Sequence, residues 1–197
     1  MGLDMYLKQD IYIGAKYEHR KVTGVCDIKI PGEKINIPFD RISSIEVDIA
    51  YWRKANHIHH WFTKDLDDDV RVEMKGEKIL ELVEDCKKVL ESLEGQNVVD
   101  KVKVGTTYET VHTIVDGEDI DEIISNMIKN EIDKNKEFIS IREYENIDLA
   151  LEILPPTEGF FFGGADIDEY YKYDLESTIE QLKDIDPNEY YIYEASY

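Results

Sequence analysis

The feature that most constrains the fold is an apolar stripe at helical spacing in residues 77–94. Side chains three or four positions apart lie on one face of a helix, so this segment predicts a helix that buries one side. Gly95 follows the stripe, where a glycine commonly ends a helix. The stripe consists of Ile79, Leu82, Val83, Cys86, Val89, Leu90 and Leu93.

The first fifty residues are rich in strand-forming residues instead. Leu3–Leu7 and Asp10–Gly14 are short aromatic and β-branched segments, and each predicts a strand. Val25–Ile30 and Lys34–Phe39 alternate apolar and polar residues on either side of a Pro-Gly pair, which predicts a hairpin. Ser44–Ile49 is compatible with a further strand or with the start of a helix.

Residues 49–63 predict a helix with two contrasting faces. Its apolar line consists of Tyr51, Ala55, Ile58 and Phe62. Its basic line consists of Arg53, His57, His60 and Lys64, and an acidic run at 65–69 ends the helix. We expect His57 and His60 to lie on a solvated face rather than to bind a metal, because no glutamate stands between them as in zinc proteases. His59 lies beside the apolar line, where a satisfied, half-buried histidine is favoured over a catalytic base.

The rest of the chain alternates strand and helix patterns. The expected elements are a β-hairpin at 97–116, a helix from Asp119 to about residue 135, a strand at 138–141, a short element at 147–154, a helix at 166–185 and a strand at 190–193. The apolar residues of the helix after Asp119 are expected to point inward. The fold predicted from these patterns is a single α+β domain over residues 1–197, with a small, mainly antiparallel sheet packed by about four helices.

Charge is distributed unevenly along the chain. Residues 1–62 carry 8 acidic and 9 basic side chains, whereas residues 137–197 carry 16 acidic and 3 basic, within a total net charge of −21. Phosphate binding needs clustered lysine and arginine, so we expect neither nucleic acid nor an anionic membrane as a direct ligand. Because no signal-peptide pattern and no long apolar run is present, we expect a soluble cytoplasmic protein, and no motif points to a cofactor or a metal.

The outer line of the helix at 166–185 concentrates this negative charge. It consists of Glu169, Tyr173, Glu176, Glu180 and Asp184. At a rise of about 1.5 Å per residue, carboxylates on this line recur every ~5–6 Å, a pitch that loosely imitates a phosphate backbone. An ordinary solvated helix face is the alternative interpretation.

A turn rich in glycine and phenylalanine precedes that helix. Glycines bracket the aromatic run Phe160–Phe162, and the segment leads into a helix N-terminus that can present backbone amides to an anion. Asp166 and Asp168 would repel such an anion, and the spacing of a P-loop or a dinucleotide-binding loop is absent. We therefore expect the phenylalanines to pack the last helix onto the sheet.

Three segments resemble a family of small, uncharacterised proteins encoded by bacteriophages and prophages. They are MGLDMYL at 1–7, YWRKANHIHHWF at 51–62, and LPPTEGFFFG at 154–163 followed by Asp166, Asp168, Glu169 and Tyr170. The family has no established activity, so the resemblance transfers no catalytic residue. It implies a phage accessory protein in a bacterial cytoplasm. The chain departs from the family pattern at His57 and His60, and it is longer between about 97 and 145, which makes that hairpin-and-helix segment a candidate insertion.

Two functional hypotheses of different classes follow. The leading one is an interaction protein, rather than an enzyme, whose acidic C-terminal face binds a basic host protein surface such as that of a nucleic-acid-binding protein. It would act as a nucleic-acid mimic that inhibits a host defence system.

The alternative hypothesis is a small-molecule or nucleotide-binding protein or a hydrolase, with a pocket between the 51–62 helix and the turn at 160–170. The candidate ligand-binding residues are Trp52, Arg53, Lys54, Asn56 and Tyr170. The candidate catalytic residues are His59, Asp166 and Asp168. Motif residues gathered around an open cleft would favour this alternative, and the same residues packed solid would favour the interaction protein.

Overall fold

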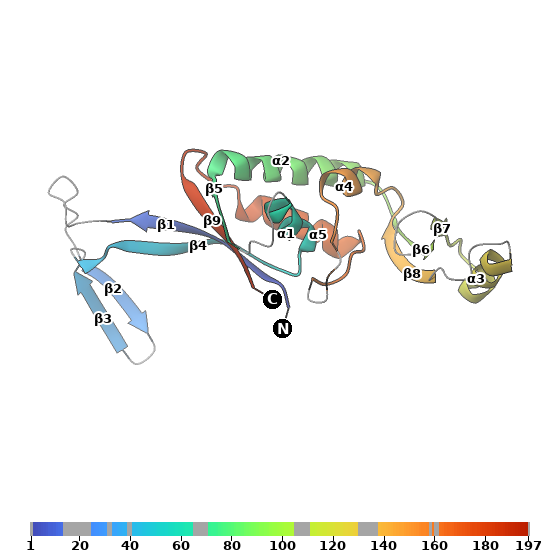
Figure 1. Cartoon of the computed structure of the whole chain (residues 1–197), viewed down its shortest axis with the longest axis horizontal. Coiled ribbons are helices and arrows are strands. Elements are labelled where there is room, and N and C mark those ends of the chain that lie inside the picture. Colours follow the sequence, from blue (N-terminus) through green and yellow to red (C-terminus); the bar gives the residue numbers. More distant parts are fainter. Residues whose placement is uncertain are drawn as a thin grey trace.

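An antiparallel sheet of four strands runs through the middle of the molecule (Figure 1). The computed structural model describes residues 2–13, 25–30, 33–38, 41–64, 71–104, 111–129, 138–157, 159 and 162–196. The sheet has the order β4-β1-β9-β5, formed by β4 (Ser44–Arg53), β1 (Asp4–Tyr12), β9 (Tyr190–Ser196) and β5 (Arg71–Lys75). The first and last strands of the chain therefore pair at its centre, with Leu7 opposite Tyr193.

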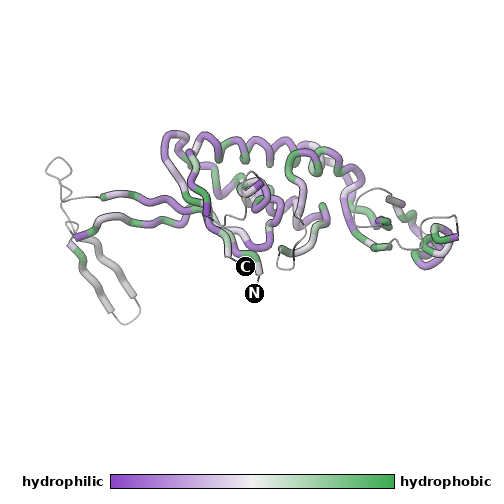
Figure 2. The backbone as a smooth tube through the Cα atoms, viewed as in Figure 1, coloured by the Kyte–Doolittle hydropathy of each residue, from purple (hydrophilic) through white to green (hydrophobic). Residues whose placement is uncertain are grey.

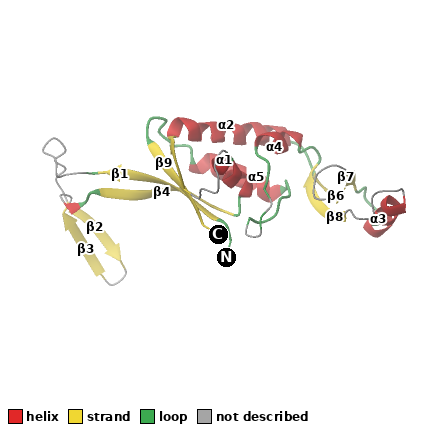
Figure 3. Cartoon of the chain, in the orientation of Figure 1, coloured by secondary structure: helices red, strands yellow, loops and turns green. Residues whose placement is uncertain are grey.

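One face of this sheet is buried beneath four helices. They are α1 (Asn56–Thr63), α2 (Gly76–Leu93), α4 (Asp148–Ile153) and α5 (Glu169–Gln181), which lie together in Figure 3. Leu7 and Tyr193 are fully buried in the core that these helices share with the sheet. Phe62 of α1 stacks on Tyr193, with ring centroids 4.1 Å apart, and α5 contacts both α2 and β4.

Two smaller sheets lie toward opposite ends of the long axis (Figure 1). One is the hairpin of β2 (Val25–Ile30) and β3 (Glu33–Pro38). The other has the order β7-β6-β8, formed by β7 (Val111–Thr113), β6 (Val98–Val104) and β8 (Phe138–Tyr144), and α3 (Ile120–Lys129) lies beside it. The second sheet and α3 occupy the span from 97 to 145 that the sequence marks as a candidate insertion.

The structure confirms the α+β class, with five helices and only antiparallel strand pairs among the described residues. The apolar stripe of α2 is buried as predicted, and hydrophobic and hydrophilic residues alternate along this helix in Figure 2. Gly95 has a φ of 75°, the left-handed conformation expected after a helix end. The acidic run at 65–69 lies outside the described residues.

The helix predicted from residue 49 is wrong in its first half. Residues 44–53 form β4 instead, where Trp52 pairs with Met5 and Tyr51 with Tyr6, and the helix begins only at Asn56. The aromatic residues at 51 and 52 fit a pleated strand, and pairing with β1 overrides a helical spacing that rested on Tyr51 alone.

Other element boundaries also differ from the sequence-based expectations. The two short strands predicted at the start form one strand, β1, whose register shifts between Leu7 and Lys8. The last helix begins at Glu169, because Asp168 rather than Asp166 caps it. The described part of α3 spans Ile120–Lys129, and the predicted continuation to about residue 135 lies outside the described residues. None of the described residues of α3 is buried, so its apolar residues do not reach the core as expected.

Candidate functional site

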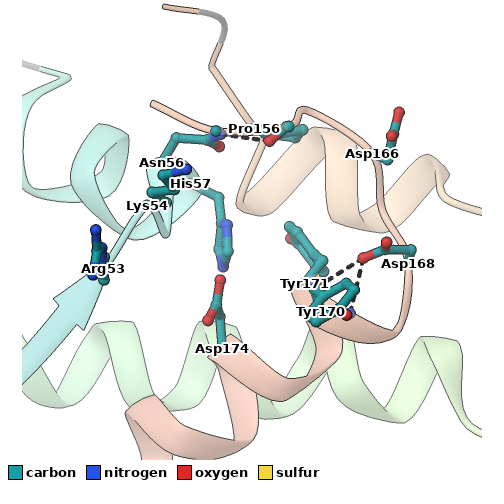
Figure 4. Close-up of a pocket in the computed structure, with 12 residues that line it drawn as sticks. Arg53, Lys54, Asn56, His57, Pro156, Asp166, Asp168, Tyr170, Tyr171 and Asp174 are labelled. Carbon is teal, nitrogen blue, oxygen red and sulfur yellow. Dashed lines mark hydrogen bonds between the residues drawn. The ribbon is translucent and has the colours of Figure 1, made fainter. Parts of the chain in front are cut away.

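A pocket of about 340 Å³ opens where three segments of the motifs meet (Figure 4). The junction between β4 and α1 forms one wall, the turn around Gly163 and Gly164 forms a second, and the first turns of α5 form a third. The pocket is lined by Arg53, Lys54, Asn56, His57, Pro156, Gly163, Gly164, Asp166, Asp168, Tyr170, Tyr171 and Asp174. The two longest motif segments thus converge on one cavity, although about a hundred residues separate them.

The wall from β4 to α1 is shaped by a sharp turn at Lys54. Lys54 has a φ of 62°, a conformation that side chains other than glycine rarely adopt. Its backbone N–H donates to the carbonyl of Leu3 at 2.8 Å, and its own carbonyl accepts from the N–H of Asn56 at 2.9 Å. Gly163 lies against this turn with a φ of 93°, and an added Cβ would stand 3.1 Å from Lys54 Cβ. The close approach therefore favours glycine at position 163.

Asn56 joins the start of α1 to the glycine-rich turn. Its Nδ2 donates to the carbonyl of Gly164 at 2.7 Å and to that of Phe162 at 3.3 Å, and its Oδ1 accepts from the N–H of Thr157 at 3.1 Å. Asn56 is almost fully buried, so these bonds satisfy an amide that water does not reach. Its role in the pocket is to hold the second wall in place.

His57 and Tyr171 form the deepest part of the pocket. His57 is only 3% exposed, and its ring lies against that of Tyr171 with centroids 4.2 Å apart. Burial lowers the pKa of His57 to about 3, so the imidazole is neutral at physiological pH. Its Nε2 is buried and makes no hydrogen bond, and the ring points toward the carboxyl group of Asp174 (Figure 4). This nitrogen is a polar group without a partner, at the inner end of a cavity.

Three carboxyl groups line the same pocket. Burial, and secondarily the charge of Asp168, raise the pKa of Asp174 to about 7. Burial likewise raises the pKa of Asp166, against the opposing effect of Lys103. Asp168 caps α5, since its Oδ1 accepts from the backbone N–H groups of Tyr170 at 2.8 Å and Tyr171 at 3.1 Å. The pocket therefore combines a neutral imidazole with two carboxyl groups, those of Asp166 and Asp174, whose pKa values are raised.

Most of the ligand-binding candidates from the sequence line this pocket. Arg53, Lys54, Asn56 and Tyr170 do so, as do two candidates of the catalytic set, Asp166 and Asp168.

Trp52 and His59 lie elsewhere. Trp52 is buried and its Nε1 donates to Thr178 Oγ1 at 2.9 Å. The Nδ1 of His59 lies 2.6 Å from the hydroxyl oxygen of Tyr193 in the core, which agrees with the satisfied histidine expected there.

The sequence did not predict that His57 and Asp174 line the pocket. His57 was expected on a solvated face, but it is buried, and the ring of Tyr171 from α5 packs against it. Asp174 went unnoticed, although it lies next to Leu175 and three residues after Tyr171, both on the inward line of α5. A carboxylate that close to a helix's buried line is a usable signal, because unpaired acidic residues rarely lie there.

The acidic outer line of α5 is exposed along its whole length. Its members Glu169, Tyr173, Glu176 and Glu180 lie at the surface, as does Asp184, which follows the end of α5 at Gln181 because the helix stops short of the predicted residue 185. Their ion pairs in the described structure involve Arg142 with Glu169, Lys172 with Glu176 and Lys183 with Glu180. All three cations come from the C-terminal part of the chain, so the basic residues of the N-terminal third do not neutralise this line through any described ion pair.

Neither a family model, nor a curated protein, nor a solved structure matches this chain. Among the described residues, no three His, Cys, Asp or Glu side chains are grouped to hold a metal ion. Within that same part of the chain, no helix has the length and apolar character needed to span a membrane.

Proposed function

We propose that the protein binds a small polar molecule in the pocket between β4, α1 and α5. The observation that carries the proposal is the buried Nε2 of His57, which lines the cavity and has no hydrogen-bond partner. Leaving a buried polar atom unpaired costs about 1–3 kcal/mol, and a ligand that bonds to it would recover that cost.

The form of the pocket supports this proposal. Its volume of about 340 Å³ falls within the range of small-molecule sites, roughly 300–1,000 Å³. Its walls are held by hydrogen bonds of Asn56 and by the N-cap of Asp168, so the cavity is already formed without a ligand. An open cleft lined by the motif residues is also the arrangement that favours ligand binding over a purely structural packing of these motifs.

A fragment screen followed by NMR tests the proposal. Hits are expected to shift the amide resonances of Tyr170 and Tyr171, which border the pocket. His57→Leu removes the unpaired nitrogen and is expected to weaken the best hits about tenfold or more, equivalent to about 1.4 kcal/mol of binding free energy. Glu176→Gln, on the exposed face of α5, is the matched control and is expected to leave binding unchanged. Hits that all bind elsewhere, or bind the His57 variant equally well, would contradict the proposal.

A second function is supported by the exposed acidic line of α5. We propose that this line forms the contact surface of a phage accessory protein, as the resemblance to phage-encoded proteins implies, and that it binds a basic protein of the bacterial host. Rows of like charge steer association with an oppositely charged surface, and salt weakens that steering.

Affinity capture from a bacterial lysate tests this second function. Host partners are expected to be retained by the wild-type chain at low salt and released as salt is raised. The double variant Glu176→Lys and Glu180→Lys should retain much less of them, because it reverses the charge on the exposed line. Partner binding that is insensitive both to salt and to the double variant would exclude this surface.

A further inference from the structure

We infer that the pocket binds a ligand through a positively charged nitrogen, such as an ammonium or amidinium group, placed between Asp174 and His57. This inference rests on the proposed small-molecule site, because it names the class of ligand for the same pocket. The position follows from Figure 4, where the carboxyl group of Asp174 and the ring of His57 point toward one another without a hydrogen bond to His57 Nε2.

Asp174 differs from Asp166 in that no cation in the described part of the protein acts on its carboxyl group, whereas Lys103 acts on that of Asp166. Asp166, Asp168 and Asp174 all line the pocket, and the pKa of Asp174 is raised by burial and by Asp168. A nearby positive charge would lower that pKa, and among the described side chains none acts on Asp174 in that direction. A bound cation would supply the missing opposite charge.

The two basic residues of the pocket direct their charges elsewhere. Arg53 Nε lies 3.9 Å from Asp4 Oδ1, and its side chain is 65% exposed. Lys54 is exposed at the rim, and its side-chain carbons lie against Gly163 and Gly2. Both cations therefore remain exposed to solvent, whereas His57 is buried and Asp174 is half-buried.

The neighbouring groups suit a nitrogen that carries several N–H donors. Neutral His57 offers a ring nitrogen as an acceptor, and ionised Asp174 offers two oxygens, so one ammonium or amidinium group can bond to both. Tyr170 and Tyr171 also border the pocket, and aromatic rings attract cations over their faces. Neither an anion nor a purely apolar group would satisfy the same set.

Binding of a cation is also expected to depend on pH through Asp174. The groups that share the pocket with this carboxyl are Arg53, Lys54, His57, Asp166, Asp168 and the two tyrosines. A cation favours the ionised carboxylate, whose fraction rises as pH increases through about 7. Apparent affinity scales with the fraction of competent protein, so it should rise about tenfold between pH 6 and pH 8.

Three probes that share one ring test the charge preference. Benzylammonium, benzyl alcohol and benzoate are titrated into the full chain, and their dissociation constants are measured from the amide shifts of Tyr170 and Tyr171. Benzylammonium is expected to bind at least about tenfold more tightly than the other two at pH 8. Asp174→Asn should remove this preference together with its pH dependence, and Glu176→Gln should preserve both.

The results of these titrations can overturn the inferred cation site in three ways. Equal or tighter binding of benzyl alcohol or benzoate in the pocket would overturn the cation preference and leave the small-molecule site standing. Binding of benzylammonium that is unchanged between pH 6 and pH 8 would overturn the role of Asp174. If benzylammonium does not shift the pocket amides, the inference fails, and the broader fragment screen then decides separately whether the pocket binds small molecules.

Discussion

Two regions of this protein bury ionisable groups, and they differ in how those groups are partnered. In the sheet of β6 and β8, Glu143 is fully buried between two lysines. Its Oε1 lies 2.5 Å from Lys103 Nζ, and its Oε2 lies 3.9 Å from Lys101 Nζ. Lys101 also donates to the carbonyl oxygen of Tyr144 at 2.6 Å. Here the protein supplies the opposite charges itself.

The floor of the pocket is arranged in the opposite way. His57 has no partner for its Nε2, and the half-buried Asp174 lies near a second carboxylate rather than near a cation. The comparison shows that burial of a charge does not by itself mark a binding site. The Oε2 of Glu143 also makes no hydrogen bond, but it lies near Lys101 Nζ. His57 differs because it lines a cavity and no charged group among the described residues pairs with its ring, so a ligand can supply the missing partner.

The largest expected loss of stability concerns the buried cluster of Glu143, Lys101 and Lys103. Glu143→Gln leaves two buried lysines without their counter-charge, and removing one side of a buried ion pair commonly costs about 3–5 kcal/mol of unfolding free energy. Urea denaturation measures this loss. Glu145→Gln, an exposed residue two positions along, is the control and should change stability by less than about 0.5 kcal/mol. Equal stability of the two variants would show that the cluster is not structural.

The second largest loss of stability is expected at Asn56, whose side-chain amide nitrogen and oxygen are both hydrogen-bonded in the wall of the pocket. Asn56→Ala removes three side-chain hydrogen bonds to the turn and is expected to lower the unfolding free energy by about 2–3 kcal/mol. Thermal unfolding of this variant, compared with Asn126→Ala on the exposed surface of α3, provides the measurement. A loss no greater than that of the Asn126 variant would contradict the role given to Asn56.

The pH dependence of stability isolates His57. Its folded pKa of about 3 lies below the unfolded value, so the unfolded chain binds a proton first as pH falls below about 6.5. Stability should therefore fall on acidification by up to about 1.4 kcal/mol per pH unit, or about 2 kcal/mol between pH 6.5 and pH 5. Denaturation curves for His57→Gln should lack this contribution, whereas His112→Gln, an exposed histidine in β7, should retain it. Identical pH profiles for wild type and His57→Gln would refute the prediction.

The smallest effect concerns Asp174. Its pKa is raised on folding, so the folded chain keeps a proton that the unfolded chain loses between about pH 4 and pH 7. Stability is therefore lost as pH rises through this window. Asp174→Asn removes the penalty and should raise the unfolding free energy by about 1 kcal/mol at pH 8, allowing for partial solvent screening, with no gain at pH 4. A variant that is less stable than wild type at pH 8 would mean that the carboxylate is already paired.

Local sequence patterns predicted a helix or strand correctly where the element's own hydrophobic periodicity determines its structure. The stripe of α2 predicted its bounds to within a residue, and the hairpin signals at 25–39 and 97–116 marked strands that pair. The apolar spacing around α5 is likewise buried: Tyr171 and Leu175 of the helix and the flanking Ile167 and Leu182 lie in the core, with Ile179 partly buried. Each of these depends on neighbours within a few residues, which a sequence displays directly.

The pocket could be predicted only in part. The motifs around Arg53 and Asp166 pointed to its location, because their residue types suit a polar site. Trp52 and His59 do not line the cavity: Trp52 bonds to Thr178, and the ring of His59 contacts Phe162 and Tyr193. α1 begins at Asn56 rather than near residue 49. In this helix His57 lines the cavity, and His59 contacts Tyr193 in the core.

The sequence by itself determined the α+β class, the long helix α2, the acidic last third and the pairing of two distant motifs as candidates for one site. Only the tertiary structure determined that β4 ends at Arg53 and that α1 begins at Asn56. It also determined that His57 is buried without a hydrogen-bond partner for its Nε2, and that Asp166 and Asp174 are both desolvated. These properties depend on segments from opposite ends of the chain meeting in space. Desolvation and hydrogen-bond satisfaction are set by that meeting and not by local spacing.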